Sequence, residues 1–443
     1  MKLTPTESES ELILDDEAAA RRSFLKKSGM LGLLGASALT GLTDVFATSG
    51  DTIRIGYISP MTGPFAPFAE ADNFTIAAVK QALSGGLQIG GKKYKVEILA
   101  RDDQSNSDRA SNLASQLINR EGVDLILAQG ALTVVNVAQQ CELNGVPCIT
   151  TMTPWQAWMF PLKGSPDKGF KSVYHFFWGI EDIAAVYSDI WQGLPTNKVV
   201  GTVWSNDVPG NAMGDPNLGM PGVWAKEGYK IVDIGRFQTG ADDFSTHIQA
   251  FKREGVEIIT GLFNPPEWAT FWRQSKQLGF KPKVATVAKA LLFPAGVEAL
   301  GQEADRMSTE IWWTPAYPFK STVTGQSTAE LKNKYESSTK RRWTQPLGVA
   351  HAMWELGIHA LKTSGNPKNP QAVSAAIGKT SLETVIGRVS WADSPIKNVA
   401  KMRVVGGQWR ILPGKGVPEL FITNNRTAPE IPVERKFEPF NQV

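Results

Sequence analysis

The chain has 443 residues, of which 42% are hydrophobic and 20% charged, as in folded globular proteins and unlike disordered ones. Its 46 lysines and arginines nearly balance 43 acidic residues, and the net charge of +3 excludes a strongly basic nucleic-acid-binding or polybasic membrane protein. Four histidines and two cysteines exclude a cysteine-rich zinc scaffold, whereas 14 tryptophans against 7 tyrosines is an unusual ratio.

Residues 1–47 predict an export signal. An acidic leader is followed by a basic motif, then by an apolar run over residues 29–42, and the segment ends at Ala47. The basic motif resembles the twin-arginine signal, and the residues that carry the resemblance are Arg21, Arg22, Phe24, Leu25 and Lys26. It departs from that signal at its first position, Ala20. The alternatives are a membrane anchor or a buried helix, but the run is shorter than the roughly 20 residues that span a bilayer. We therefore expect cleavage near Ala47 and a periplasmic protein.

Strands and helices alternate in the next part of the chain. Short apolar runs predict strands at 53–59, 96–100, 124–128 and 147–150. Apolar residues at helical spacing separate them, for example Val134, Val137, Ala138 and Cys141. This alternation predicts an α/β unit with a parallel sheet between two layers of helices.

A second α/β unit follows a segment rich in tryptophan, proline and glycine at 152–178. Its predicted strands lie at 199–203, 231–234, 257–263 and 283–287. Residues 204–221 read as a long loop, either a cap over a cleft or a surface insertion. A strong helix is expected over 348–363, and the length of the chain agrees with two to three domains.

No motif in the sequence indicates catalysis, a metal or a cofactor. Residues 86–93 half-match a phosphate-binding loop, but Lys93 stands where a hydroxyl must reach magnesium, so a hairpin-like turn is expected. His351 and His359 lie eight residues apart without an acidic third ligand, which favours structural roles. No serine elbow or Cys/His pair marks a nucleophile, so we expect a non-enzyme and keep a secreted hydrolase as a remote alternative.

The two cysteines, Cys141 and Cys148, fall within one helix–loop–strand unit. In an oxidising compartment they could form a disulfide. The alternative is that they are two small buried apolar residues, since disulfide geometry is demanding and the segment is short. Both interpretations stay open at this point.

Several segments resemble the substrate-binding proteins of branched-chain amino acid ABC transporters. They are residues 53–65 (IRIGYISPMTGPF), 101–105 (RDDQS), 242–245 (DDFS), 271–275 (FWRQS) and 385–391 (VIGRVSW). The resemblance runs from about residue 52 to 412 and rests on the order and spacing of these segments. It implies a two-lobed periplasmic binding protein of type I, in which each lobe is a mainly parallel sheet flanked by helices.

The resemblance also implies three hinge crossovers, expected near Phe176, Trp313 and Ser390. Lobe 1 would be 52–176 plus 313–389, and lobe 2 would be 177–312 plus 390–443. Part of the tryptophan excess falls near these crossovers and indicates an aromatic-lined site, at Trp155, Trp158, Trp178, Trp312 and Trp313.

In lobe 1 the family binds the ligand carboxylate at a helix N-terminus after the third strand. That turn is formed here by Gly130, Ala131, Leu132 and Thr133, whose N–H groups and helix dipole would favour an anion unless the turn is a simple cap. The loop after the fourth strand adds Met152, Thr153 and Trp155. Phe68 stands where relatives carry an aromatic that packs on the ligand.

Lobe 2 departs from the amino-acid-binding pattern. Asn264 or Pro265 takes the place of an aromatic, and Lys289 stands near the position of the carboxylate that pairs with the ligand's ammonium group. A cation cannot play that role, so the ligand is expected to be a carboxylate or amide rather than a simple α-amino acid. Asn206 and Asp207 begin the 204–221 segment and are further candidates.

The resemblance implies an extracytoplasmic solute-binding protein that delivers its ligand to the permease subunits of an ABC importer in the inner membrane. The ligand would be a small carboxylate-bearing compound or an amino-acid-like solute, with no cofactor, no metal and no nucleic acid. A monomer is expected. The alternative is a ligand-sensing module of the same fold.

Overall fold

The computed structural model describes residues 51–131 and 133–440. Two predictions lie outside these ranges. One is the export signal at 1–47, with its Arg21–Arg22 pair and its cleavage site near Ala47, and the other is the candidate residue Leu132. Within the described ranges, no helix is both long and apolar enough to cross a membrane.

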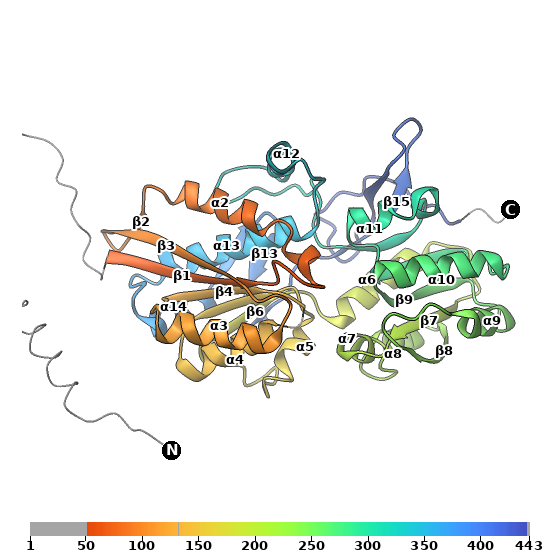
Figure 1. The fold of residues 1–443 in the computed structure, drawn as a ribbon, viewed down its shortest axis with the longest axis horizontal. Coiled ribbons are helices and arrows are strands. Elements are labelled where there is room, and N and C mark those ends of the chain that lie inside the picture. The colour runs from red at the N-terminus through yellow and green to blue at the C-terminus, as the bar shows by residue number, and fades with distance from the viewer. Residues whose placement is uncertain (1–50, 132, 441–443) are drawn as a thin grey trace, which may run out of the picture. The chain divides into compact units, whose positions relative to one another are not determined.

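The first sheet has the strand order β14-β6-β5-β4-β1-β3-β2 (Figure 1). All neighbours pair in parallel except β2 with β3. Its strands are β1 (Thr52–Ser59), β2 (Leu87–Ile89), β3 (Lys92–Asp102), β4 (Leu125–Gln129), β5 (Cys148–Thr151), β6 (Val173–Phe176) and β14 (Val399–Ala400). The antiparallel β2–β3 pair turns through Gly90 and Gly91, both at positive φ, which confirms the hairpin predicted for residues 86–93.

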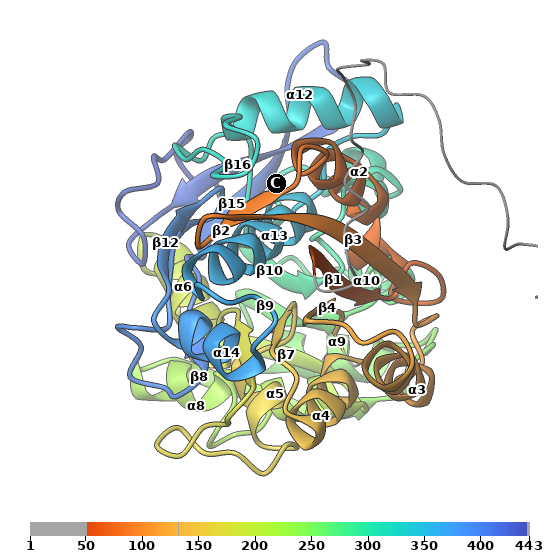
Figure 2. The same cartoon turned by 90° about the vertical axis from the view of Figure 1, so that its left-hand side faces the viewer.

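Helices cover both faces of this sheet because its central strands are apolar on both sides. Leu125 and Leu127 belong to the core shared with α2 and α13, whereas Ile126 and Ala128 belong to the core shared with α3 and α4 (Figure 2). The helices of this part are η2 (Ala66–Ala69), α2 (Asp72–Ala82), α3 (Ser107–Asn119), α4 (Val134–Asn144), α5 (Trp155–Met159), α12 (Thr328–Thr339), α13 (Pro346–Thr363) and α14 (Pro370–Gly378).

The second sheet has the order β16-β15-β11-β10-β9-β7-β8. Its strands are β7 (Val199–Ser205), β8 (Lys230–Phe237), β9 (Ile258–Phe263), β10 (Val284–Lys289), β11 (Ser308–Ile311), β15 (Val405–Ile411) and β16 (Pro418–Asn424). Strand β15 pairs antiparallel with both β11 and β16, and the other neighbours pair in parallel. Its helices are α6 (Ile180–Gln192), α7 (Val208–Met213), α8 (Met220–Lys226), α9 (Ser245–Arg253), α10 (Pro265–Gln277), α11 (Pro294–Glu298) and η3 (Gly301–Ala304). The predicted fold class, two mainly parallel α/β sheets flanked by helices, is confirmed.

The chain passes between the two sheets after Phe176, after Ile311 and after Ala400. The third crossover, predicted near Ser390, was placed too early, because Val399 and Ala400 still pair with β6 of the first sheet. Before that crossing, β12 (Ser381–Thr384) and β13 (Gly387–Ser390) form a separate hairpin. The remaining lobe limits stay predictions.

One local expectation was wrong, and the two interpretations left open for the cysteines are resolved. The segment at 204–221, read as a loop, contains α7 and the start of α8. Its helical signal is the cap Asp207, whose Oδ1 accepts the Gly210 N–H at 2.8 Å, followed by a proline in the first turn. Cys141 and Cys148 are free and fully buried, so the structure holds no disulfide between them. They pack as small apolar residues in the core below α4, where burial raises the pKa of the Cys148 thiol.

Candidate ligand-binding site

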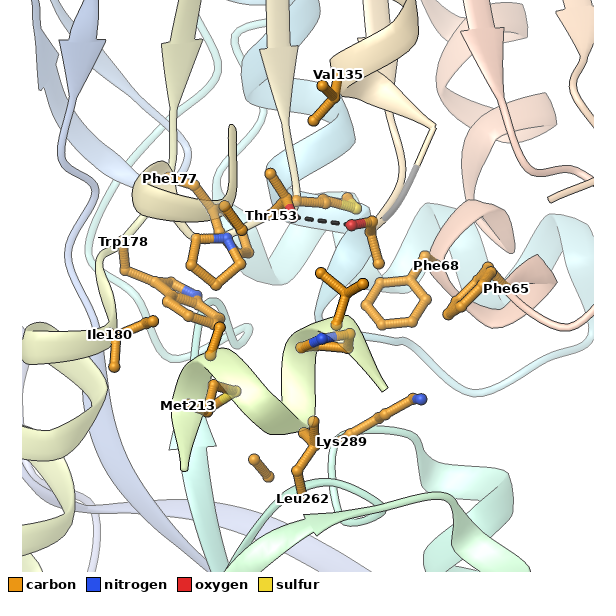
Figure 3. A pocket seen from close by; sticks show the side chains of 18 of the residues that line it. Phe65, Phe68, Val135, Thr153, Phe177, Trp178, Ile180, Met213, Leu262 and Lys289 are labelled. Atoms are coloured by element: carbon orange, nitrogen blue, oxygen red, sulfur yellow. Dashed lines mark hydrogen bonds between the residues drawn. The ribbon is translucent and has the colours of Figure 1, made fainter. Parts of the chain in front are cut away.

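A cavity of about 480 Å³ lies where the carboxyl ends of strands from both sheets meet (Figure 3). This is the edge where open α/β sheets bind ligands. Its lining residues are Phe65, Phe68, Ser107, Ala131, Val135, Asn136, Met152, Thr153, Pro154, Ala157, Pro161, Phe177, Trp178, Ile180, Val208, Pro209, Ala212, Met213, Leu262, Ala288, Lys289, Leu292, Glu310 and Trp312.

One side of the cavity is an aromatic wall made of Phe65, Phe68, Trp312, Phe177 and Trp178. The rings form a continuous row. The Phe65 and Phe68 centroids are 6.2 Å apart, those of Phe68 and Trp312 6.1 Å, and those of Trp312 and Trp178 5.8 Å. Phe177 packs edge-on against Trp312 at 5.1 Å. Because these contacts join rings from η2 and from two crossovers, the wall is held by its own packing.

The opposite side, the α7 wall, is aliphatic. It consists of Val208, Pro209, Ala212 and Met213 from α7 together with Leu262 and Ala288 at the ends of β9 and β10. The predicted site residue Asp207 does not line the cavity. Its carboxylate accepts hydrogen bonds from the Gly210 N–H and the Ser205 hydroxyl, both at 2.8 Å, and so holds the start of α7.

Lys289 supplies the positive charge at one end of the cavity. It ends β10 with φ at 64°, a left-handed conformation that is costly for a residue with a side chain and is found at functional sites. Its Nζ lies 5.5 Å from the centroid of Phe65. Burial lowers the pKa of Lys289, while the charges of Asp207 and Glu267 act in the opposite direction. The sequence prediction placed this residue in the site, and it lines the cavity.

Glu310 is a buried carboxyl of the lining that the sequence did not reveal. It lies on β11 and its Oε2 accepts hydrogen bonds from Tyr187 Oη at 2.5 Å and from Thr309 Oγ1 at 2.9 Å. Burial raises the pKa of Glu310, and these hydrogen bonds act against that rise. One oxygen of the carboxyl is therefore already occupied by the protein.

The helix start predicted as an anion site borders the cavity. Ala131 precedes α4, whose first turn adds Val135 and Asn136 to the lining. Thr153 Oγ1 donates to the Ala131 carbonyl at 2.9 Å and ties this turn to the loop after β5. Met152 in that loop has φ at 67°, so a strained residue follows β5 just as Lys289 ends β10.

Four more of the predicted residues lie outside the lining. Gly130 adopts φ at 143°, and a Cβ there would lie 2.8 Å from Thr133 Oγ1, so this glycine is required by the turn. Thr133 is buried beside it. The Asn264 backbone N–H donates to Glu267 Oε2 at 2.8 Å and begins α10 as its cap. The Asn206 backbone N–H donates to the Phe237 carbonyl at 2.7 Å.

The tryptophans near the crossovers divide into two groups. Trp178 and Trp312 line the cavity. Trp155 does not, because its indole donates to Glu181 Oε1 at 3.0 Å. Trp158 stacks on His175 at 4.9 Å, and Trp313 packs beneath Gly348, where an added Cβ would lie 2.2 Å from its ring. The aromatic-lined site predicted from the tryptophan excess therefore involves a subset of these residues.

The described lining residues include no histidine or cysteine. Among residues 51–131 and 133–440, no group of three or more His, Cys, Asp or Glu side chains could hold a metal ion. His351 is fully buried on α13 and its Nε2 lies 2.7 Å from Ser321 Oγ. The cavity thus offers a mostly apolar lining in which Lys289 is the basic residue and Glu310 the acidic one among the described residues.

The fold and this cavity define a class of two-sheet binding protein. A periplasmic binding protein family model matches residues 52–409, and the chain belongs to that family. The Leu/Ile/Val-binding protein homolog 6 of Brucella suis is 24% identical over 256 residues, which are 53% of this chain and 57% of that protein. The chain thus spans little more than half the length of the curated relatives that it matches.

Solved structures agree on the fold. A leucine-binding protein LivK of Thermotoga maritima superimposes with a TM-score of 0.66 at 19% identity, covering 84% of this chain and 99% of that one. A solute-binding protein of an ABC transporter from Rhodopseudomonas palustris HaA2, solved with p-hydroxybenzoic acid, has a TM-score of 0.66 at 17% identity, covering 88% and 97%. At these identities the likeness concerns the fold alone.

Proposed function

We propose that the chain is an extracytoplasmic solute-binding protein that captures a small carboxylate-bearing solute in the cavity and delivers it to an ABC importer. The observation that carries this proposal is the cavity itself. Both sheets contribute to it, apolar side chains dominate it, and Lys289 is the cation among its described lining residues. Membership of the periplasmic binding protein family supports the same conclusion.

A carboxylate suits this cavity for a physical reason. A buried ammonium group is costly unless an opposite charge accompanies it, and burial lowers the pKa of Lys289 more than the charges of Asp207 and Glu267 raise it. A ligand carboxylate would supply that partner. The unpaired N–H groups at the start of α4 favour the same charge.

A free α-amino acid suits it less well, because its ammonium group needs a carboxylate. Among the described lining residues Glu310 is the acid, and its Oε2 already accepts from Tyr187 and Thr309. Relatives named for branched-chain amino acids and a neighbour solved with p-hydroxybenzoic acid bracket the chemical range to be tested. We propose an acid without the ammonium group.

The direct test is a thermal-shift and titration-calorimetry screen of the chain without its proposed export signal. A ligand at 100 times its dissociation constant adds roughly 2.7 kcal/mol to the free energy of unfolding. We expect such a shift with aromatic or aliphatic acids. Tight binding of leucine or valine would contradict the ligand class, and no shift with any acid, amide or amino acid would contradict the receptor function.

A charge test uses Lys289→Met. Hydrogen bonds to charged groups contribute about 1.5–3 kcal/mol, so affinity for the acid should fall roughly 10- to 100-fold. The matched control is Lys283→Met, just before the same strand, since Lys283 Nζ pairs with Glu257 Oε1 at 2.9 Å. The control should keep the wild-type affinity. Equal effects of the two changes would remove Lys289 from the site.

The importer partnership, periplasmic location and monomeric state belong to the same proposal. Genes for a permease and an ATPase beside this gene would favour transport over the sensory alternative. Cell fractionation after an Arg21→Lys, Arg22→Lys double change would test export, which should be lost. Light scattering of the purified chain would test the monomer.

A further inference from the structure

The Trp178 end of the cavity contains a polar group without a partner. Trp178 lines the cavity, is 5% exposed, and its indole N–H has no hydrogen-bond partner among the described residues. Figure 3 shows its ring projecting into the cavity beside Ile180, on the side away from Phe65 and Lys289. A buried donor left without an acceptor costs about 1–3 kcal/mol.

This indole differs from the other unpaired indoles of the described chain. Those of Trp158, Trp204, Trp313 and Trp354 also lack a partner, but they lie in the packed core and none of them lines the cavity. The other lining indole, that of Trp312, also lacks a hydrogen-bond partner, but it lies close enough to the Glu310 carboxyl to act against the rise of that group's pKa. Trp178 is therefore the indole donor at which a ligand atom could arrive.

The row of rings separates this donor from the positive charge. Lys289 Nζ lies over Phe65, and the row then runs from Phe65 through Phe68 and Trp312 to Trp178 in steps of 6.2, 6.1 and 5.8 Å. The cation and the indole donor consequently mark the two ends of one aromatic wall. A ligand that spans the wall meets a charge at one end and a neutral donor at the other.

We infer that the ligand is an aromatic carboxylic acid with an acceptor oxygen at the end of the ring system opposite the carboxylate. This inference rests on the proposed function and adds the second end of the ligand to it. The carboxylate pairs with Lys289, the flat body lies along the aromatic wall, and the far oxygen accepts the Trp178 N–H. A water-sized unit, counted as one non-hydrogen atom, takes ~30 Å³. The cavity of about 480 Å³ therefore has room for a molecule on the order of fifteen non-hydrogen atoms.

Two isosteric acids test the far end. In 4-methoxycinnamate an ether oxygen stands where 4-ethylcinnamate has a methylene group, so the two differ in the acceptor and hardly in size. Titration calorimetry with the wild-type chain should show the methoxy acid binding about 10-fold more tightly. In Trp178→Phe, which keeps a ring but removes the N–H, that ratio should fall to about one.

The matched control is Trp158→Phe, which removes an unpaired indole N–H outside the cavity and should keep the ratio. Equal binding of the two acids by the wild-type chain, or an unchanged ratio in Trp178→Phe, would overturn the inference and leave the proposed function intact. If the wild-type chain binds neither acid, the inference is also overturned. If it binds no unsubstituted acid either, the proposed function is overturned as well. If Trp178→Phe does not fold, the wild-type ratio alone decides.

Discussion

The two walls of the cavity are held in different ways. In the aromatic wall, Phe68, Trp312 and Trp178 are at most 6% exposed and contact one another. In the α7 wall, Val208 is 71% exposed, and the helix that carries it has six residues fixed by the cap Asp207. These three rings are all buried in the core, whereas the side chains of α7 range from the buried Met213 to the exposed Val208.

This difference shows how the site divides its tasks. Side chains fixed before a ligand arrives lose little conformational entropy on binding, so the aromatic wall is preorganised. It also has support from behind, since Gln129 Nε2 donates to Asp72 Oδ1 and, at 3.4 Å, to the Phe68 carbonyl. We therefore expect changes in the aromatic wall to cost more stability than changes in the α7 wall, and changes in either wall to weaken binding.

The largest effect is expected for Trp312→Ala. Trp312 contacts Phe68, Phe177 and Trp178, so its loss removes the centre of the row. The free energy of unfolding should fall by about 3–5 kcal/mol, and ligand binding should be lost. Urea unfolding and calorimetry measure the two effects. Trp312→Phe, the control, should keep most of the stability, and a loss below 1 kcal/mol in the alanine variant would show that the wall is not part of the core.

The next effect concerns the support behind the wall. Burial raises the pKa of Asp72 to about 7, with nearby Asp103 adding to the rise. Between about pH 4 and pH 7 the folded chain keeps a proton that the unfolded chain releases, so this group's contribution to stability falls as the pH rises. Asp72→Asn should therefore be about 2 kcal/mol more stable than wild type at pH 8, with no advantage at pH 4.

The control for that change is Glu355→Gln. Burial raises the pKa of Glu355 to about 7 as well, but its two oxygens accept the N–H groups of Thr322 at 2.6 Å and Val385 at 3.0 Å. The NH₂ group of a glutamine amide would face one of these two backbone N–H groups, and neither group can accept a hydrogen bond. This variant should therefore be less stable at every pH. If the free energy of unfolding of the two variants depends on pH in the same way, the pH dependence of stability cannot be assigned to Asp72.

A smaller effect is expected for Met213→Ala in the α7 wall. Met213 is 4% exposed but borders the cavity, so it has fewer contacts to lose than a core methionine. Stability should fall by about 1–2 kcal/mol, and affinity by roughly 3- to 10-fold. Both losses, measured as for Trp312, should be smaller than those in the aromatic wall. A collapse of stability here would erase the distinction between the walls.

The smallest effect is expected for Val208→Ala. Its exposed side chain contributes little to the core, so stability should change by less than about 0.5 kcal/mol. Its position at the cavity mouth should still weaken ligand binding about two-fold, which titration calorimetry resolves. An unchanged affinity would show that the ligand does not reach the exposed end of α7.

The sequence predicted most of the fold because buried parallel strands leave a direct pattern. The runs at 53–59 and 257–263 correspond to Thr52–Ser59 and Ile258–Phe263. The third crossover was misplaced because β14 has only two residues, too few for a pattern. Short elements such as α7 are defined by a cap and a proline, which a glycine-rich context conceals.

Candidate site residues that follow a strand could be predicted from the sequence. Those whose position depends on packing between the two sheets could not. Phe68, Ala131, Met152, Thr153 and Lys289 were identified by position and line the cavity. Phe177 lies in a crossover and Glu310 on a buried strand, and neither local pattern shows which way the side chain points. Asn206, Asn264 and Trp155 have the right residue types, but their side chains hydrogen-bond to Asn211, Glu267 and Glu181 of the protein itself.

The placement of Trp178 and Trp312 gives the molecule an optical reporter. Both follow a strand at the point where the chain crosses between the sheets, and both lie against the ligand space. Any rotation of one sheet relative to the other changes the surroundings of two indoles at once. Ligand capture should therefore shift the intrinsic emission spectrum without an added dye, and the change should disappear when both residues are replaced by phenylalanine.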